Sequence, residues 1–102
     1  MTLNDHRRRI DKLDRELVRL LNRRAQMSIQ LAQIKRETGL PMRDEAREED
    51  ILRHAQRYNP GPLDAQAVVA LFQHILDESR RVAAEVLLEP VGDAADSQRG
   101  AQ

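Results

Sequence analysis

Apolar residues recur along the first third of the chain at steps of three and four, the spacing of one face of a helix. Neither glycine nor proline interrupts the segment from Asn4 to Thr38. Asn4 or Asp5 is suited to cap its start, and Gly39 followed by Pro41 is a typical stop signal. The pattern therefore predicts a rod of about 34 residues and roughly 50 Å, which needs a partner helix along its apolar seam. The seam consists of Ile10, Leu13, Leu17, Leu20, Met27, Leu31 and Ile34.

Two shorter helical patterns follow this segment. Asp44 is suited to cap a helix that runs to about Arg57 and carries a narrow apolar face of Ile51, Leu52 and Ala55. Asp64 is suited to cap another that runs to about Leu88, before Pro90. Its apolar stripe is Val68, Leu71, Phe72, Ile75, Leu76, Val82, Val86 and Leu87. The predicted fold class is therefore all-α, with a long first helix, a short second helix and a medium third helix.

Polar residues interrupt two of these apolar stripes. Arg24 takes the seam position between Leu20 and Met27, and Lys35 lies about three turns later on the same face. One interpretation is a polar residue that sets the register of a coiled coil, and the other is an anion pocket inside a helical bundle. The second requires carboxylates or an anionic ligand, because burying an unpaired guanidinium is strongly unfavourable. Ser79 interrupts the third stripe, although a buried serine often bonds back to its own helix.

Acidic and basic residues also share one side of the predicted second helix. Asp44, Arg47 and Glu48 follow one another at spacings of three and four from its start. Ordinary surface ion pairing is the more common explanation of such a group, and a binding site is the alternative.

Composition narrows the class of protein. The chain has 102 residues, which argues for one domain, and 33% charged against 2% aromatic residues, which favours helices. Basic and acidic residues number 17 each, so no net charge attracts nucleic acid or an anionic membrane. Cysteine is absent, the three histidines lack metal-ligand spacing, and no apolar run approaches the roughly 18 residues of a membrane span. We expect a soluble cytoplasmic protein with neither nucleic acid nor membrane as partner.

Several of these residues together resemble a known enzyme family. The motifs are Arg7, Ile10-Asp11-x-Leu13-Asp14, Leu20-Leu21-x-Arg23-Arg24, Ile34-Lys35, Leu40-Pro41-x-Arg43-Asp44, Arg47-Glu48, Leu71-Phe72-x-x-Ile75 and Ser79. Their order and spacing resemble the AroQ-type, all-helical chorismate mutases. The resemblance covers roughly residues 3–88, so we assign 1–89 to a chorismate mutase-like domain and expect 90–102 to be a disordered tail.

The resemblance implies an intertwined homodimer in which two long first helices pair. Each active site would take most of its residues from one chain and Arg7 from the other. Helical spacing agrees, because Arg7 precedes Arg24 by 17 residues and lies about 100° away around the helix. Both arginines can address one ligand only if they come from different chains.

The resemblance also implies a reaction, the Claisen rearrangement of chorismate to prephenate in aromatic amino-acid biosynthesis, which needs no cofactor or metal. In this family pattern Arg24, helped by Ser79, binds the ring carboxylate, and Arg7 binds the enolpyruvyl carboxylate. Lys35 donates to the ether oxygen. The remaining matched residues orient the ring hydroxyl or brace the site, namely Asp44, Glu48 and Arg47.

One substrate-binding position departs from the family pattern. Four residues after the site serine the family usually carries Gln or Glu, a second donor to the ether oxygen, and here that residue is Ala83. Three explanations stay open. An activating partner enzyme completes the site, Arg80 or Gln30 supplies the donor, or the substrate is a relative of chorismate.

Other functions fit the same pattern. The fold resembles mutases of 4-amino-4-deoxychorismate and isochorismate-pyruvate lyases, of which the lyase fits less well. From a different class, the chain would be a non-catalytic dimeric helical module that docks on a shikimate-pathway enzyme. Ala83 favours that alternative. The retained residues of the family pattern oppose it, namely Arg7, Arg24, Lys35, Asp44, Glu48 and Ser79.

Overall fold

The computed structural model describes residues 1–88, which form three helices and no strand. They are α1 (Leu3–Thr38), α2 (Glu45–Tyr58) and α3 (Ala65–Leu88). The predicted all-α class is confirmed, and each helix boundary lies close to the position expected from the sequence. The tail expected at 90–102 lies outside the described residues.

The start of α1 differs from the prediction. Thr2 is the N-cap, and the expectation that Asn4 or Asp5 caps this helix was wrong. The Thr2 hydroxyl accepts from the Asp5 N–H at 3.1 Å, while the Thr2 N–H donates to the Asp5 carboxylate at 2.9 Å. This reciprocal capping box satisfies two N–H groups at once, which a lone Asn or Asp cap does not do.

The other helix ends confirm the sequence signals. Gly39 closes α1 with φ of 74°, in the left-handed region that favours glycine. The Asp44 carboxylate accepts from the Arg47 N–H at 3.0 Å, and the Asp64 carboxylate accepts from the Ala67 N–H at 2.8 Å. Both aspartates therefore cap the helices that they precede.

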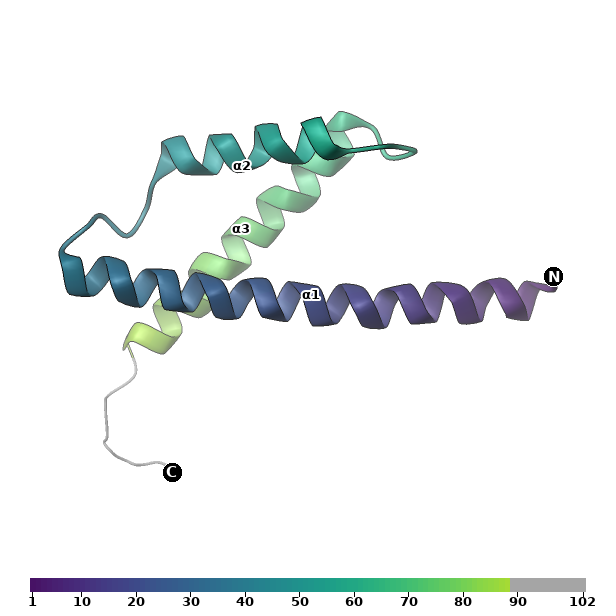
Figure 1. Cartoon of the computed structure of the whole chain (residues 1–102), viewed down its shortest axis with the longest axis horizontal. Coiled ribbons are helices and arrows are strands. Elements are labelled where there is room, and N and C mark those ends of the chain that lie inside the picture. The colour runs from purple at the N-terminus through teal and green to yellow at the C-terminus, as the bar shows by residue number, and fades with distance from the viewer. Residues whose placement is uncertain (89–102) are drawn as a thin grey trace, which may run out of the picture.

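α3 packs against both α1 and α2, and the N-terminal half of α1 extends beyond its crossing with α3 (Figure 1). Two hydrogen bonds join α1 to α3, from Arg24 to the Ser79 hydroxyl at 3.1 Å and from Arg36 to the Leu87 carbonyl at 2.9 Å. The bond that involves the later residue of α1 also involves the later residue of α3, so the two helices run in the same general direction.

The core of the single chain is small. Among residues 1–88 the buried side chains are Ala32, Val68, Leu76 and Ala83. In contrast, all seven seam residues of α1 are more than half exposed. The chain has a radius of gyration of 17.8 Å, well above the roughly 13 Å of a compact domain of this length. Most of the apolar surface of α1 is thus presented outward, on a rod too long for its own chain to cover.

Each helix within residues 1–88 falls short of the length and apolar character that crossing a bilayer requires.

Candidate functional site

A cavity of about 750 Å³ lies among the C-terminal half of α1, the start of α2 and the C-terminal half of α3. This volume falls within the range of small-molecule sites. Seven of the eight residues singled out from the sequence line it. They are Arg24, Lys35, Asp44, Arg47, Glu48, Ser79 and Ala83.

Arg7 is the residue that the fold does not bring to this cavity. It is exposed near the start of α1, 17 residues before Arg24 on one uninterrupted helix. At 1.5 Å per residue the two positions are about 26 Å apart along the axis. Arg7 of the same chain therefore cannot join Arg24 on one small ligand.

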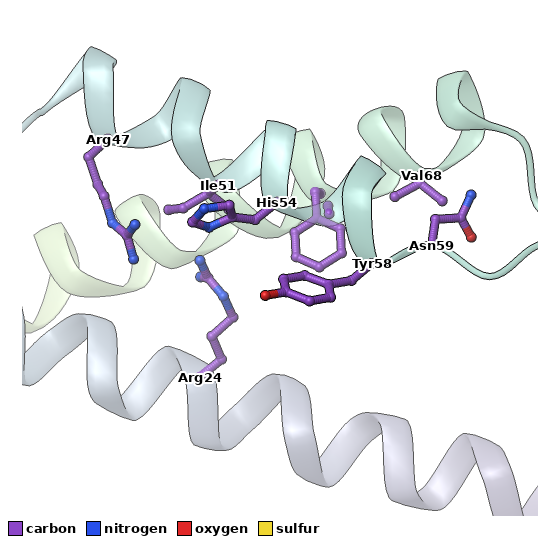
Figure 2. Close-up of a pocket in the computed structure, with 9 residues that line it drawn as sticks. Arg24, Arg47, Ile51, His54, Tyr58, Asn59 and Val68 are labelled. Carbon is purple, nitrogen blue, oxygen red and sulfur yellow. The ribbon is translucent and has the colours of Figure 1, made fainter.

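Arg24 is the half-buried cation at the centre of the arrangement. Its guanidinium donates to the Ser79 hydroxyl across the α1–α3 contact at 3.1 Å. Burial lowers the pKa of Arg24, and the nearby positive charge of Arg47 lowers it further. Figure 2 shows the two guanidinium groups pointing toward each other from α1 and α2. Two like charges that converge in a partly desolvated place favour an anionic ligand between them.

Lys35 is the second cation that α1 contributes to the cavity. Its side chain is half-buried, and the ammonium donates to the Met42 carbonyl in the loop before α2 at 3.3 Å. An ammonium has three N–H donors, so this single long bond leaves donors for a ligand.

Two carboxylates line the cavity from the start of α2. Asp44 uses one oxygen to cap the helix. Glu48 is more deeply placed, and it accepts from Arg43 at 3.4 Å and forms an ion pair with Arg80 of α3. The acids are thus held in fixed positions by helix capping and by ion pairing.

The charge lining the cavity is predominantly positive. Two carboxylates, Asp44 and Glu48, face six cations, so an anionic ligand of more than one charge is favoured. Within residues 1–88 no group of three or more histidines or acids is placed to share a metal ion. The six cations are Arg24, Lys35, Arg36, Arg43, Arg47 and Arg80.

A second cavity, of about 510 Å³, adjoins the first and shares Arg24, Arg47 and Ile51 with it. Phe72 and Tyr58 also line this second cavity, and Figure 2 shows the Tyr58 hydroxyl directed toward Arg24. Arg24 and Arg47 therefore lie between the first cavity, which is lined by cations, and the second, which is lined mainly by apolar and aromatic side chains.

Sequence reasoning gave no role to two of the cavity's arginines and named a third only as a substitute donor. Arg36 was not named, Arg43 appeared only within the Leu40-Pro41-x-Arg43-Asp44 motif, and Arg80 was considered only because of Ala83. Arg36 and Arg80 fall next to predicted site residues, Lys35 and Ser79, in the chain. Adjacency of this kind is the signal that was available, but helical periodicity alone does not tell which neighbour faces the site.

The fold and the site together define a class, an all-helical protein with a cation-lined cavity of small-molecule size. A model of the family described as chorismate mutase type II matches residues 6–84. A bifunctional chorismate mutase/prephenate dehydratase from Neisseria gonorrhoeae is 42% identical over 73 residues, covering 72% of this chain and 20% of that protein. The chain spans about a fifth of the length of the curated relatives it matches.

Solved structures agree with the sequence relatives. A chorismate mutase from Thermus thermophilus has a TM-score of 0.74 and 32% identity, over 76% of this chain and 96% of that one. A chorismate mutase from Helicobacter pylori, solved in complex with prephenate, has a TM-score of 0.78 and 28% identity, over 86% of this chain and 96% of that one. The chain belongs to the type II chorismate mutase family.

Proposed function

We propose that this chain acts as a homodimeric chorismate mutase that converts chorismate to prephenate. The observation that carries the proposal is the convergence of Arg24, Lys35 and Glu48, from two helices, on one cavity dominated by positive charge. Chorismate is a dianion, and so is its product. The prephenate bound to the Helicobacter pylori relative supports the same substrate class for this site.

The rearrangement needs no nucleophile, so the residues act by holding the reactive conformer and by stabilising charge. Arg24, already bonded to Ser79, is suited to grip the ring carboxylate, because a guanidinium binds a carboxylate with two parallel bonds. Lys35 donates to the ether oxygen, where negative charge develops as the C–O bond breaks. These interactions would be stronger in the transition state than in the bound substrate, and they would therefore accelerate the reaction.

The remaining residues orient the substrate. Asp44 and Glu48 accept from the ring hydroxyl, which suits their place at the start of α2. Arg47 braces the site, and its charge adds to the attraction for a dianion. Fixed acceptors of this kind also discriminate against substrates that lack the hydroxyl.

The dimer accounts for the exposed seam and for Arg7. Two α1 helices paired antiparallel along the seam would bury side chains that are otherwise more than half exposed. If the two-fold axis passes near Leu17, Arg7 of the partner comes opposite Met27, about one turn from Arg24. The partner's arginine would then bind the enolpyruvyl carboxylate.

The test is the loss of chorismate absorbance with purified protein, with prephenate and pyruvate quantified in the same reaction. We expect prephenate without pyruvate, and a loss of about 100-fold or more in kcat for Lys35→Ala on the typical scale of one preorganised donor. Lys12→Ala, the other lysine of the chain, is the matched control and should behave as the parent.

Products are also quantified with two related substrates, and three outcomes would contradict the proposal. Pyruvate formation from isochorismate, without conversion of chorismate, would indicate a lyase. A folded protein that leaves chorismate unchanged but converts 4-amino-4-deoxychorismate would indicate a mutase of the amino analogue, and activity on neither would favour a non-catalytic module.

A further inference from the structure

Arg80 lies on the face of α3 that lines the cation-rich cavity. Leu76, Arg80, Ala83 and Leu87 follow one another at steps of four, three and four, and all four line this cavity. Arg81, the next residue, pairs with Glu78 at 2.7 Å and with Glu85 at 2.8 Å along its own helix and lines neither cavity that Arg24 lines. Two adjacent arginines thus face different surroundings.

The contacts of Arg80 hold its guanidinium in place. It pairs with Glu48 across the α2–α3 contact and with Asp77 one turn earlier on α3. Among residues 1–88 the Glu48 pair is the one ion pair that joins two helices, and its side chains are only 34% and 16% exposed. A guanidinium has five N–H donors, so two carboxylate partners leave donors for a third acceptor.

Ala83 leaves space beside this guanidinium. A long side chain at position 83 would lean toward the preceding turn of α3, which carries Ser79 and Arg80, because helical side chains point toward the N-terminus. Alanine ends at Cβ, and Ala83 is itself buried at 7% exposure. The part of the cavity that a longer residue would fill is therefore open to Arg80.

We propose that Arg80 contacts the substrate and is the second cationic donor of the site, acting from α3 while Lys35 acts from α1. This inference rests on the proposed mutase function. In the rearrangement the ether C–O bond breaks as a C–C bond forms, and the ether oxygen becomes a ketone oxygen without any co-reactant. The negative charge that this oxygen carries in the transition state is what Arg80 stabilises.

The test compares four variants of the full chain with the parent, namely Arg80→Ala, Arg81→Ala, Ala83→Gln and the double variant Arg80→Ala/Ala83→Gln. For each, prephenate formation, calorimetric affinity for prephenate and the thermal unfolding midpoint are measured. We expect Arg80→Ala to lose about 100-fold or more in kcat, and Arg81→Ala to match the parent. Ala83→Gln is the reference for the double variant, in which the glutamine should restore about tenfold or more of the kcat lost in Arg80→Ala by supplying a donor to the same space.

Two results would overturn the role of Arg80. One is equal activity of folded Arg80→Ala and Arg81→Ala. The other is a lower unfolding midpoint for Arg80→Ala, together with no recovery of kcat when Ala83→Gln is added. That result is expected if the ion pair between Arg80 and Glu48 only stabilises the packing of α2 on α3. A folded parent that neither converts chorismate nor binds prephenate would instead refute the proposed function itself.

Discussion

At the scale of single residues, the site concentrates positive charge that the chain itself does not neutralise. The Arg24 guanidinium donates to the neutral hydroxyl of Ser79, and the positive charge of Arg47 repels it. Burial and this repulsion make the pKa of Arg24 lower in the folded state than in the unfolded state. The charged form of Arg24 therefore destabilises the fold at every pH below the folded-state pKa. This destabilisation is lost only as the pH rises through the folded-state pKa, far above neutrality. Near neutral pH this penalty is present in full, and binding of a dianion would offset it.

Arg47→Gln tests whether this charge lowers the stability of the free protein and raises its affinity for an anion. The substitution removes the repulsion between Arg47 and Arg24, so the unfolding midpoint of the free protein should stay equal or rise at neutral pH. Affinity for prephenate, measured by calorimetry, should fall roughly tenfold or more, as for loss of a charged hydrogen-bond partner. Arg57→Gln, an exposed position on the same helix that lines neither cavity, is the control. A lower midpoint together with unchanged affinity would show that Arg47 has a structural role instead.

At the scale of helices, the start of α2 combines a capping role with a place in the cavity. The Asp44 carboxylate caps α2 through the Arg47 N–H, and the same side chain lines the cavity. This cap fixes the Asp44 side chain and the backbone of Arg47. Glu48 follows at the next position, so one helix start sets three of the site residues.

Two substitutions separate the roles of Asp44. Asparagine is as good a cap as aspartate, so Asp44→Asn should keep the unfolding free energy, whereas Asp44→Ala should lose about 1 kcal/mol. Both variants remove the carboxylate, and both should lose catalytic activity to a similar degree. Denaturant unfolding and prephenate formation measure the two effects. Full activity in Asp44→Asn would mean that the carboxylate serves only as a cap.

The helices were largely predictable because their signals are local. Apolar spacing, Asp44, Asp64 and Gly39 all act within a few residues, and the structure confirms each of them. The cap of α1 was misjudged because several cap-forming residues lie together at the chain start, and only the Thr2–Asp5 pairing distinguishes them. Local signals of this kind set element boundaries to within about one turn.

The site was only partly predictable because it depends on which helix faces meet. Arg24, Lys35 and Ser79 stood out as polar residues on apolar stripes, and they do line one cavity. Arg80 lies at helical spacing from Leu76 and Leu87, but the sequence does not show that it meets Glu48, 32 residues earlier, across the α2–α3 contact. Ala32 and Ala83 were likewise absent from the expected core, although short side chains are what a close helix crossing buries.

At the scale of the whole molecule, the outward-facing seam of α1 is the feature that the single chain leaves unexplained. A rod 36 residues long carries seven large apolar side chains that are each more than half exposed. Burying each such side chain typically contributes about 1.5–3 kcal/mol, so a paired arrangement is strongly favoured. The same pairing would bring a second Arg7 toward the cavity.

Leu17→Glu tests the pairing at the centre of the seam. A pair of glutamates near the two-fold axis should dissociate the dimer, because like charges would be forced together out of water. Activity should fall with dimer content in sedimentation experiments at a range of concentrations. Arg15→Glu, an exposed residue on the opposite side of α1, should leave both unchanged. Activity retained by a monomeric Leu17→Glu protein would contradict a site shared between chains.

The most direct test of a shared active site is complementation between Arg7→Ala and Arg24→Ala. Each variant alone should be nearly inactive, because every site would lack one arginine. After verified subunit exchange at equal concentrations, half of the dimers are mixed, and one of the two sites in each is intact, so about a quarter of the parent activity should return. If exchange is complete and no activity returns, Arg7 does not act across the dimer and the shared-site account is wrong.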